Sequence, residues 1–340
     1  MTTSSKPRVS VVMPVRNEAA FIRHSAGALL QQDYPGELLE IIVADGGSDD
    51  ATREILDSLA REQAAPRLRI IDNPERIFST GFNRGVAAAD GEVIVMMGGH
   101  TVVAHDYVSE AVKALEASGA DCVGGFIETV AMDAASEPIA LAMASKFGVG
   151  GVAFRTVRDE LRDVDTVAFG AYRRATLDAL GPLDEELVRN QDDELNYRLR
   201  GRGGRILLVP SIRSRYHSRS SLRTLARQYF WYGYWKVRVM QKHPLQMRWR
   251  HFVPPLFVAS LVTAAAIAPL TVWPLVLLSG AYVAAALSAA VVVAATAGWS
   301  HILKLPLIFA TLHLGYGAGF LLGLVRFAHR WRRAAPPPTR

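Results

Sequence analysis

Polar side chains that could do chemistry follow several short apolar runs of the sequence. Asp45 ends the run LEIIVAD, and the two glycines after it permit a tight turn. His100 follows the run EVIVMM, and Asp192 and Asp193 lie in the acidic stretch NQDDEL. Carboxylates and imidazoles can accept protons or bind a cation. Each also has a structural interpretation, because Asp45 or Asp193 can cap a helix and His100 can be a surface histidine.

The apolar runs that position these residues alternate with helical segments from Arg8 to about Val209. The runs read VSVVMP, LEIIVAD, LRIIDN, EVIVMM and RILLVP. Near-continuous Val, Ile and Leu joined by helices predicts an α/β fold, a mainly parallel sheet with helices on both faces. We expect Pro14 to stop the first strand and Asn17 with Glu18 to open a helix. Ligands bind such sheets at the carboxyl ends of strands.

The charges divide the chain into two opposed halves. All 32 Asp and Glu lie in residues 1–194 beside 18 Lys and Arg, which gives a formal charge of −14. The remainder carries the other 20 basic residues and no acid, so its charge is +20. This asymmetry predicts an anionic partner for the second half, either a phospholipid surface or a nucleic acid.

The single cysteine, Cys122, excludes a disulfide framework and a cysteine-rich zinc site. We expect this side chain to be buried, in a protein of a reducing compartment. Residues 1–7 lack the apolar core of a signal peptide, and we expect them to be a disordered lead.

Three long apolar stretches follow residue 250. FVPPLFVASLVTAAAIAPLTVW and PLVLLSGAYVAAALSAAVVVAATAG contain no charge, and ILKLPLIFATLHLGYGAGFLLGLV contains only Lys304. Each reaches the ~20 residues that a helix needs to cross a bilayer. We predict two to three transmembrane helices in residues 251–328, rather than a buried hairpin of a soluble protein.

Residues 218–250 mix Arg and Lys with Tyr, Phe and Trp at helical spacing. Beside apolar spans this pattern favours a helix on anionic headgroups over a nucleic-acid-binding arm, so we expect no nucleic-acid partner. The basic residues place the preceding domain in the cytoplasm, as part of a multi-pass protein of the inner or plasma membrane. The basic tail, 329–340, also favours the cytoplasm, whereas three crossings would put it outside. The number of crossings therefore stays open.

Five motifs occur in one order along the first two thirds of the chain. They read VSVVMPVRNE, IIVADGGSDDAT, GFNRGVAAADGEVIV, FGAYRRATLDALGPLDEEL and NQDDELNYRLRGRGGRILLVP. Together they resemble the inverting family-2 glycosyltransferases of the GT-A fold, in particular the bacterial membrane enzymes of the succinoglycan and exopolysaccharide type. The resemblance implies a GT-A domain at residues 8–217 and a nucleoside-diphosphate sugar as donor, in the first place a UDP-sugar.

The resemblance assigns the nucleotide site to the first motifs. Pro14, Arg16 and Glu18 would line it, and Asp45 would accept a hydrogen bond from a uracil-like base. Asn83 and Arg84 would approach the ribose or the diphosphate; their alternative is a pair on a helix surface.

The acceptor side follows from the later motifs. Gly170 and Arg173 resemble the family's acceptor-side loop, and the segment from Gly124 on resembles a loop-rich insertion over the acceptor cleft. Asp192 would be the catalytic base that deprotonates the acceptor hydroxyl, where the family has Glu-Asp and this chain has Gln-Asp. Asp193 is the runner-up and could instead cap a helix.

The metal motif is where the sequence departs from the family. After the fourth run the family places Asp-x-Asp or Asp-x-His, whose first carboxylate helps to bind a divalent cation. Gly98 stands at that position here, while His100 remains. Hard Mg²⁺ prefers oxygen ligands, and imidazole suits Mn²⁺ better. A second ligand could be His217, which matches a histidine that closes the metal site in many relatives.

A site without metal is also possible, because Arg215, Arg219 and Arg223 could stabilise a departing diphosphate. The sequence therefore predicts a membrane-attached inverting glycosyltransferase that extends a lipid-linked, polyprenyl-type saccharide for an exopolysaccharide or cell-envelope glycan. The alternative is a non-catalytic membrane scaffold of the same fold, in which Gly98 marks the lost site.

Overall fold

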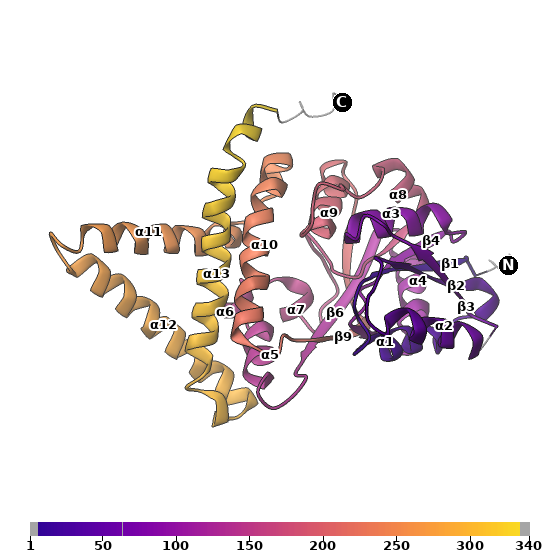
Figure 1. The fold of residues 1–340 in the computed structure, drawn as a ribbon, viewed down its shortest axis with the longest axis horizontal. Coiled ribbons are helices and arrows are strands. Elements are labelled where there is room, and N and C mark those ends of the chain that lie inside the picture. Colours follow the sequence, from indigo (N-terminus) through magenta and orange to yellow (C-terminus); the bar gives the residue numbers. More distant parts are fainter. Residues whose placement is uncertain (1–5, 63, 334–340) are drawn as a thin grey trace. The chain divides into compact units, whose positions relative to one another are not determined.

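The computed structural model describes residues 6–62 and 64–333, which form two compact units (Figure 1). The first unit runs to Glu128 and includes Val157–Tyr216, and the second contains Thr129–Thr156 and the chain from His217 onward. The boundary at His217 lies one residue before the predicted end of the catalytic domain. Segment 129–156, which we assigned to that domain, instead belongs to the second unit.

The first unit is built on a nine-stranded sheet. Its strands are β1 (Val9–Val15), β2 (Leu39–Asp45), β3 (Arg67–Asp72), β4 (Val93–Met96), β5 (Thr101–Val103), β6 (Cys122–Val130), β7 (Arg162–Asp163), β8 (Ala171–Arg173) and β9 (Ile206–His217). Their order is β3-β2-β1-β4-β8-β6-β9-β5, with β7 beside β9. The strands from β3 to β4 pair in parallel, whereas β8 pairs antiparallel with β4 and β6, and β9 with β5 and β7. The predicted parallel sheet is thus one half of a mixed sheet.

Helices cover both faces of the parallel half. They are α1 (Ile22–Leu30), α2 (Thr52–Glu62), α3 (Phe78–Ala88), α4 (Tyr107–Ser118), α8 (Arg174–Leu180) and α9 (Gln191–Gly201). Val11 and Met13 of β1 lie in a core that includes residues of α1, α2 and α4. Val12 points to the opposite face, because side chains alternate along a strand. There α3 approaches closely, and a Cβ on Gly85 would lie 2.2 Å from Val12 Cγ1.

Two local predictions for the first unit were wrong. Pro14 does not stop the first strand, since β1 continues to Val15 and pairs with Asp45 across the sheet. The buried Pro14 side chain packs toward α3. A Cβ added to Gly81 of that helix would lie 2.9 Å from the Cβ of Pro14. The following helix, α1, begins at Ile22 rather than at Asn17.

The second unit is helical. Its helices are α5 (Glu137–Ala144), α6 (Lys146–Val149), α7 (Ala153–Thr156), α10 (Leu222–Lys242), α11 (Val253–Ile267), α12 (Trp273–Ala297) and α13 (Leu305–Arg326). Short 3-10 turns lie at η1 (Gly36–Leu38, in the first unit), η2 (Pro244–Gln246), η3 (Trp249–His251), η4 (Trp299–His301) and η5 (Ala328–Arg333). The predicted loop-rich insertion after Gly124 is therefore wrong, because β6 and three helices occupy most of it.

Three helices in the described chain are long and apolar enough to cross a membrane, as judged by length and composition. They span Trp249–Ile267, Trp273–Ala297 and Leu305–Arg326. They differ in burial, since 22%, 11% and 39% of their apolar windows are buried within the protein. Figure 1 shows α11 and α12 leaving α13 and meeting at a turn away from it.

Helices α10 and α13 pack side by side with almost no space between their backbones (Figure 1). Gly315, Gly319 and Gly323 of α13 face Ala226, Phe230 and Tyr234 of α10. A Cβ on Gly319 would lie 1.9 Å from the carbonyl oxygen of Phe230. Glycine at every fourth position is the pattern that lets two helices approach most closely.

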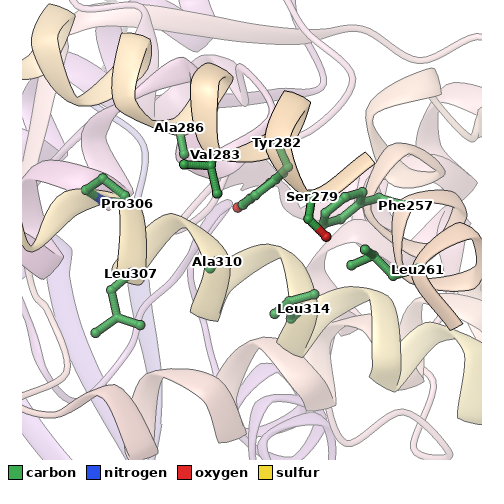
Figure 2. A pocket seen from close by; sticks show the side chains of 10 residues that line it. All are labelled: Phe257, Leu261, Ser279, Tyr282, Val283, Ala286, Pro306, Leu307, Ala310 and Leu314. Carbon is green, nitrogen blue, oxygen red and sulfur yellow. The ribbon is translucent and has the colours of Figure 1, made fainter. Parts of the chain in front are cut away.

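An apolar pocket of about 300 Å³ lies among α11, α12 and α13 (Figure 2). The ring of Tyr282 stacks on Phe257 with centroids 4.5 Å apart. Its hydroxyl lies 2.9 Å from Nδ1 of His313, and Nε2 of that histidine lies 2.9 Å from the Phe147 carbonyl oxygen. The polar groups beside the pocket are therefore hydrogen-bonded within the second unit.

We predict that Gly319→Leu destabilises the second unit, because the new side chain has no room against Phe230. Overpacking of this kind costs about 1–3 kcal/mol, which lowers Tm by roughly 2–12 °C. Ala318→Leu is the matched control, since Ala318 is exposed on the same helix. Thermal unfolding in detergent measures both variants, and an equal loss in the two would contradict the close α10–α13 packing.

Candidate functional site

The carboxyl ends of three parallel strands meet at one edge of the sheet. Val15, Asp45 and Asp72 lie in register at the ends of β1, β2 and β3. Asp45 is buried, whereas the side chain of Asp72 is 85% exposed. Arg53 of α2 lies between them, with Nη1 3.0 Å from Asp72 and 3.6 Å from Asp45. This edge is where a ligand of a parallel sheet is expected.

Asp45 is held by the turn that follows it. The Ser48 hydroxyl donates to Asp45 Oδ1 at 2.6 Å, and the Ser48 amide donates to the same oxygen at 3.2 Å. The other oxygen, Asp45 Oδ2, faces Arg53 at 3.6 Å. The structure thus fixes the orientation of Asp45, which we predict to recognise the nucleobase of the donor.

The turns after β1 and β2 bind each other. Asn17, which has a φ of 56°, donates from its side chain to Asp49 at 2.7 Å and accepts from the Asp49 amide at 3.0 Å. Asn tolerates this left-handed conformation better than most residues. A Cβ on Gly46 would lie 3.2 Å from Cβ of Arg16, whose side chain is exposed. The predicted nucleotide residues Arg16 and Asp45 therefore belong to one surface.

Glu18 and His100 form a pair across the ends of β1 and β4. His100 Nδ1 lies 3.0 Å from Glu18 Oε1, and both side chains are about three-quarters buried, at 24% and 20% exposure. The His100 ring packs edge-on against Tyr216 at 5.2 Å and against Phe21 at 6.3 Å. When Nδ1–H donates to the carboxylate, the lone pair lies on Nε2, where it can bind a cation.

The glycine turn before His100 has little space for larger residues. A Cβ on Gly99 would lie 2.9 Å from Cγ of Glu18, and the Gly99 carbonyl accepts a 2.5 Å hydrogen bond from Ser25. A Cβ on Gly98 would lie 3.1 Å from the ring of Phe169. The aromatic ring therefore packs where the family's carboxylate would begin, and Glu18 is the carboxylate paired with His100.

The side chains present can bind a cation only if most of its ligands come from elsewhere, such as a bound diphosphate. No group of three or more His, Cys, Asp and Glu side chains suited to a metal occurs among the described residues. The Glu18–His100 pair supplies an imidazole oriented by a carboxylate, which is the usual setting of a metal-binding histidine. A cation bound to a diphosphate needs only one or two protein ligands.

His217 is the last residue of β9 and the first of the second unit, directly after Tyr216. Its pairing with His100 at a metal stays a prediction. Arg215 is engaged in the first unit, where its Nε lies 3.1 Å from Glu128. Arg219 follows β9 and is half-buried, and its role toward a diphosphate also stays a prediction.

Asp192 and Asp193 lie in the first turn of α9, where the positive end of the helix dipole favours carboxylates. Asp192 Oδ1 accepts from the Asp193 amide at 2.9 Å. Asp193 Oδ1 accepts from the Thr166 hydroxyl at 2.8 Å, so it binds the neighbouring segment. These contacts give Asp193 a structural task, and the role of Asp192 as the catalytic base stays a prediction.

A buried polar network lies beneath these two carboxylates. Tyr172 donates to Asn196 Oδ1 at 2.8 Å, and Asn196 donates to Thr166 at 2.9 Å. Burial, with the nearby Cys122 and Asp192, raises the pKa of Tyr172 well above its usual value, so its hydroxyl remains a donor. No periodic pattern indicates this network in advance, because Tyr172, Asn196 and Thr166 come from three separate segments.

The predicted ribose and diphosphate residues are engaged within the protein. Asn83 donates to the Leu183 carbonyl at 3.0 Å and accepts from the Leu183 amide at 2.8 Å. Arg84 forms two hydrogen bonds to Glu75, at 2.7 and 3.1 Å, which lower the pKa of the Glu75 carboxyl. Their contact with a nucleotide stays a prediction.

The predicted acceptor loop has structural contacts of its own. A Cβ on Gly170 would lie 2.9 Å from Cys122 Sγ, and Cys122 is fully buried as predicted, which raises the pKa of its thiol. Arg173 donates to the carbonyls of Leu115 and Ala120 at the end of α4. Contact of Gly170 or Arg173 with an acceptor sugar stays a prediction.

A comparison with known protein families identifies the family to which this site belongs. A family described as glycosyl transferase family 2 matches residues 10–181, which include the Asp45 turn and the Glu18–His100 pair. The chain belongs to glycosyl transferase family 2. It is therefore a glycosyltransferase, as predicted. The match ends before Asp192, so it does not reach the proposed base.

Similar proteins extend the match over the second unit. The succinoglycan biosynthesis protein ExoA of Rhizobium meliloti (strain 1021) is 32% identical over 94% of this chain and 96% of its own length. The dolichyl N-acetyl-α-D-glucosaminyl phosphate 3-β-D-2,3-diacetamido-2,3-dideoxy-β-D-glucuronosyltransferase of Methanococcus voltae is 26% identical over 71% of this chain and 76% of its own length.

Among solved structures, the mannosyltransferase PcManGT of Pyrobaculum calidifontis, in complex with GDP-Man and Mn²⁺, has a TM-score of 0.61. It is 21% identical, and the match covers 94% of this chain and 88% of that one. The likeness confirms the predicted GT-A fold.

We predict that Asp45→Asn weakens binding of UDP roughly 10- to 150-fold, because a hydrogen bond to a charged acceptor contributes about 1.5–3 kcal/mol. Asp72→Asn is the matched control, since Asp72 also pairs with Arg53 but is exposed. Calorimetric titration with UDP gives both Kd values. Equal Kd values for the two variants would show that Asp45 does not recognise the nucleobase.

Proposed function

We propose that this glycosyltransferase inverts the configuration of a sugar that it transfers from a nucleoside-diphosphate sugar to a lipid-linked saccharide. The observation that carries the proposal is the edge where β1, β2 and β4 end. There the buried Asp45, the exposed Arg16 and the Glu18–His100 pair lie on neighbouring strand ends. Asp45 would recognise the nucleobase and the paired His100 would bind the phosphates, so the donor would be held in one orientation.

The donor is inferred from the chemistry of Asp45. A carboxylate accepts from the imide N–H of uracil, which makes a UDP-sugar the first choice. Guanine also presents an N–H donor, and a protein of similar fold was solved with GDP-Man. A screen with UDP- and GDP-sugars therefore tests the proposal, and binding of neither nucleotide would refute it.

Asp192 acts as the base in the proposed reaction. Its carboxylate takes the proton of the acceptor hydroxyl as that oxygen attacks the anomeric carbon from the face opposite the diphosphate. The bond to the diphosphate breaks in the same displacement, so the configuration inverts. Thr166 holds Asp193 and thereby positions the first turn of α9 that carries Asp192.

His100 is the proposed cation ligand through Nε2, and Glu18 keeps its ring oriented. A divalent cation, Mn²⁺ or Mg²⁺, would neutralise charge on the leaving diphosphate when bound. Arg219 and His217 are further candidates near the chain's entry into α10.

The acceptor is inferred from the membrane character of the second unit. Three helices could span a bilayer, and the relative ExoA is named for succinoglycan biosynthesis. We therefore propose a multi-pass protein of the inner or plasma membrane, with a cytoplasmic catalytic unit. The product would be a lengthened lipid-linked glycan for an exopolysaccharide or another envelope polymer.

We expect Asp192→Asn to lower kcat by about 10²–10⁴-fold, the usual contribution of a general base, without changing the Kd for UDP. Asp193→Asn should keep most of the activity, because its role is to accept a hydrogen bond that an amide oxygen can also accept. Transfer assays with membranes and a lipid acceptor measure both. The assignment fails if Asp192→Asn turns over like the parent.

We expect Glu18→Gln to raise the Mn²⁺ concentration needed for donor binding about 10- to 100-fold, since partners that orient a ligand contribute this much. His100→Ala should raise it at least as far, because it removes the ligand itself. His105→Ala is the control, because His105 is an exposed histidine close in sequence. UDP titrations at several Mn²⁺ concentrations report binding apart from turnover. Unchanged binding and activity in chelator would exclude the cation and favour the arginines.

A further inference from the structure

We propose that only α11 and α12 enter the bilayer, as a hairpin, while α13 stays at the membrane surface beside α10, so that both ends of α13 lie on the same side. All three helices are apolar and long enough to cross. Length and composition therefore do not distinguish them. Their packing within the second unit does.

The first argument is the register between α10 and α13. The glycine contacts of α13 pair residues 226 with 315, 230 with 319 and 234 with 323, and Gly233 of α10 in turn lies against Tyr316 and Phe320, so the partners are 83 to 89 residues apart all along the helices. Both numbers rise together, and the two helices therefore run parallel. At the C-terminal end Gln241 donates to the Phe327 carbonyl at 2.9 Å, which continues the contact beyond the glycines. One helix cannot cross a bilayer without the other.

The second argument is the charge of α10. It carries Arg223, Arg227, Lys236, Arg238 and Lys242 along its length. Arg227 directly follows Ala226, which contacts Gly315 at the middle of α13. A charged side chain at the centre of a bilayer is costly, because it loses most of its hydration there. A crossing α13 would draw Arg227 to that depth and the other charges into the hydrocarbon, whereas a surface position leaves them among headgroups.

The third argument is which side chains remain uncovered. The exposed apolar residues of α13 recur at helical spacing on one stripe, with Leu307, Leu314, Leu322 and Val325 among them. Helix α12 instead buries only Ala286, Ala290 and Ala294 and exposes apolar residues around the rest of its surface. Helix α13 is apolar on its covered faces as well, but it presents only this one stripe to its surroundings, and a membrane surface can cover such a stripe. The wider exposed apolar surface of α12 suits the hydrocarbon core.

The ends of α13 are also tied to polar partners. Before its first residue, His301 lies 3.0 Å from Glu137 of the segment that follows β6. After its last residue, the carbonyl of Phe327 accepts the 2.9 Å hydrogen bond from Gln241 of α10. A hairpin with two crossings returns the chain to the side from which it started. The basic tail then satisfies the charge rule that three crossings would violate.

Reporter cysteines test this topology, because the natural Cys122 is fully buried and serves as a silent background. Three single substitutions are made at exposed positions: Arg61→Cys in the catalytic unit, Ser300→Cys before α13 and Ala328→Cys after it. A membrane-impermeant maleimide is applied to intact cells and to inverted vesicles, and labelling in detergent gives the reactive total. We expect all three to react from one side. Reaction of Ala328→Cys and Ser300→Cys from opposite sides would overturn the proposal.

A second measurement compares one arginine in each helix. Leu287→Arg lies near the middle of α12 and Leu314→Arg near the middle of α13, and the parent leucines are 46% and 40% exposed. The fraction of protein that stays in membranes after an alkaline wash is measured for both. We expect Leu287→Arg to lose most of that fraction and Leu314→Arg to keep it. A loss at Leu314→Arg as large as at Leu287→Arg would overturn the surface position of α13. Neither measurement needs turnover, so failure here is separate from failure of the proposed reaction.

Discussion

The parallel pairing of β1 with both β2 and β4 is the constraint on which the candidate site depends. It brings the ends of these strands together, although they are separated by many residues in the chain. Asp45, Glu18 and His100 then become neighbours without any of them needing a strained position of its own. The turns add precision, because Asn17 and Ser48 bind across the gap between the first two strand ends.

The structure gives a physical reason for the glycine at position 98, where the family has a carboxylate. The ring of Phe169 and the Glu18 side chain fill the space around the two glycines, so the turn is closely packed rather than empty. Phe169 has a φ of 55°, which is unusual for a bulky residue, and Tyr107 donates a 2.5 Å hydrogen bond to its carbonyl. The local structure thus supports His100 through Glu18 instead of through an acidic residue of the turn.

Much of the first unit could be predicted from sequence, because long apolar runs such as LEIIVAD carry a strong signal for buried parallel strands. The antiparallel strands β5 and β8 have only three residues each, too few for a period to appear. Pro14 was misleading, since a strand tolerates proline where no ladder hydrogen bond from its nitrogen is needed. Single residues after strands were identified, but pairings such as Glu18 with His100 depend on the sheet order, which no local pattern contains.

The second unit was predicted less well, for a related reason. Hydropathy identifies apolar helices but not their neighbours, and α13 passes the same test as α12. Gly315, Gly319 and Gly323 lie four residues apart, and only the structure shows that their partner is the basic α10. The helical content of 129–156 was missed because its helices have four to eight residues.

The separation between α10 and α13 along the chain also has a consequence for biosynthesis. When α10 leaves the ribosome, the surface that contacts α13 has no partner until residues 83 to 89 positions later have been made. At ordinary elongation rates this interval is roughly 5–20 s. In the proposed topology α11 and α12 emerge and enter the bilayer during that time, and their insertion brings α13 back to the helix that precedes them. The order of synthesis thus places membrane insertion before the helix pair closes, and a chaperone or the membrane surface would have to protect α10 in the meantime.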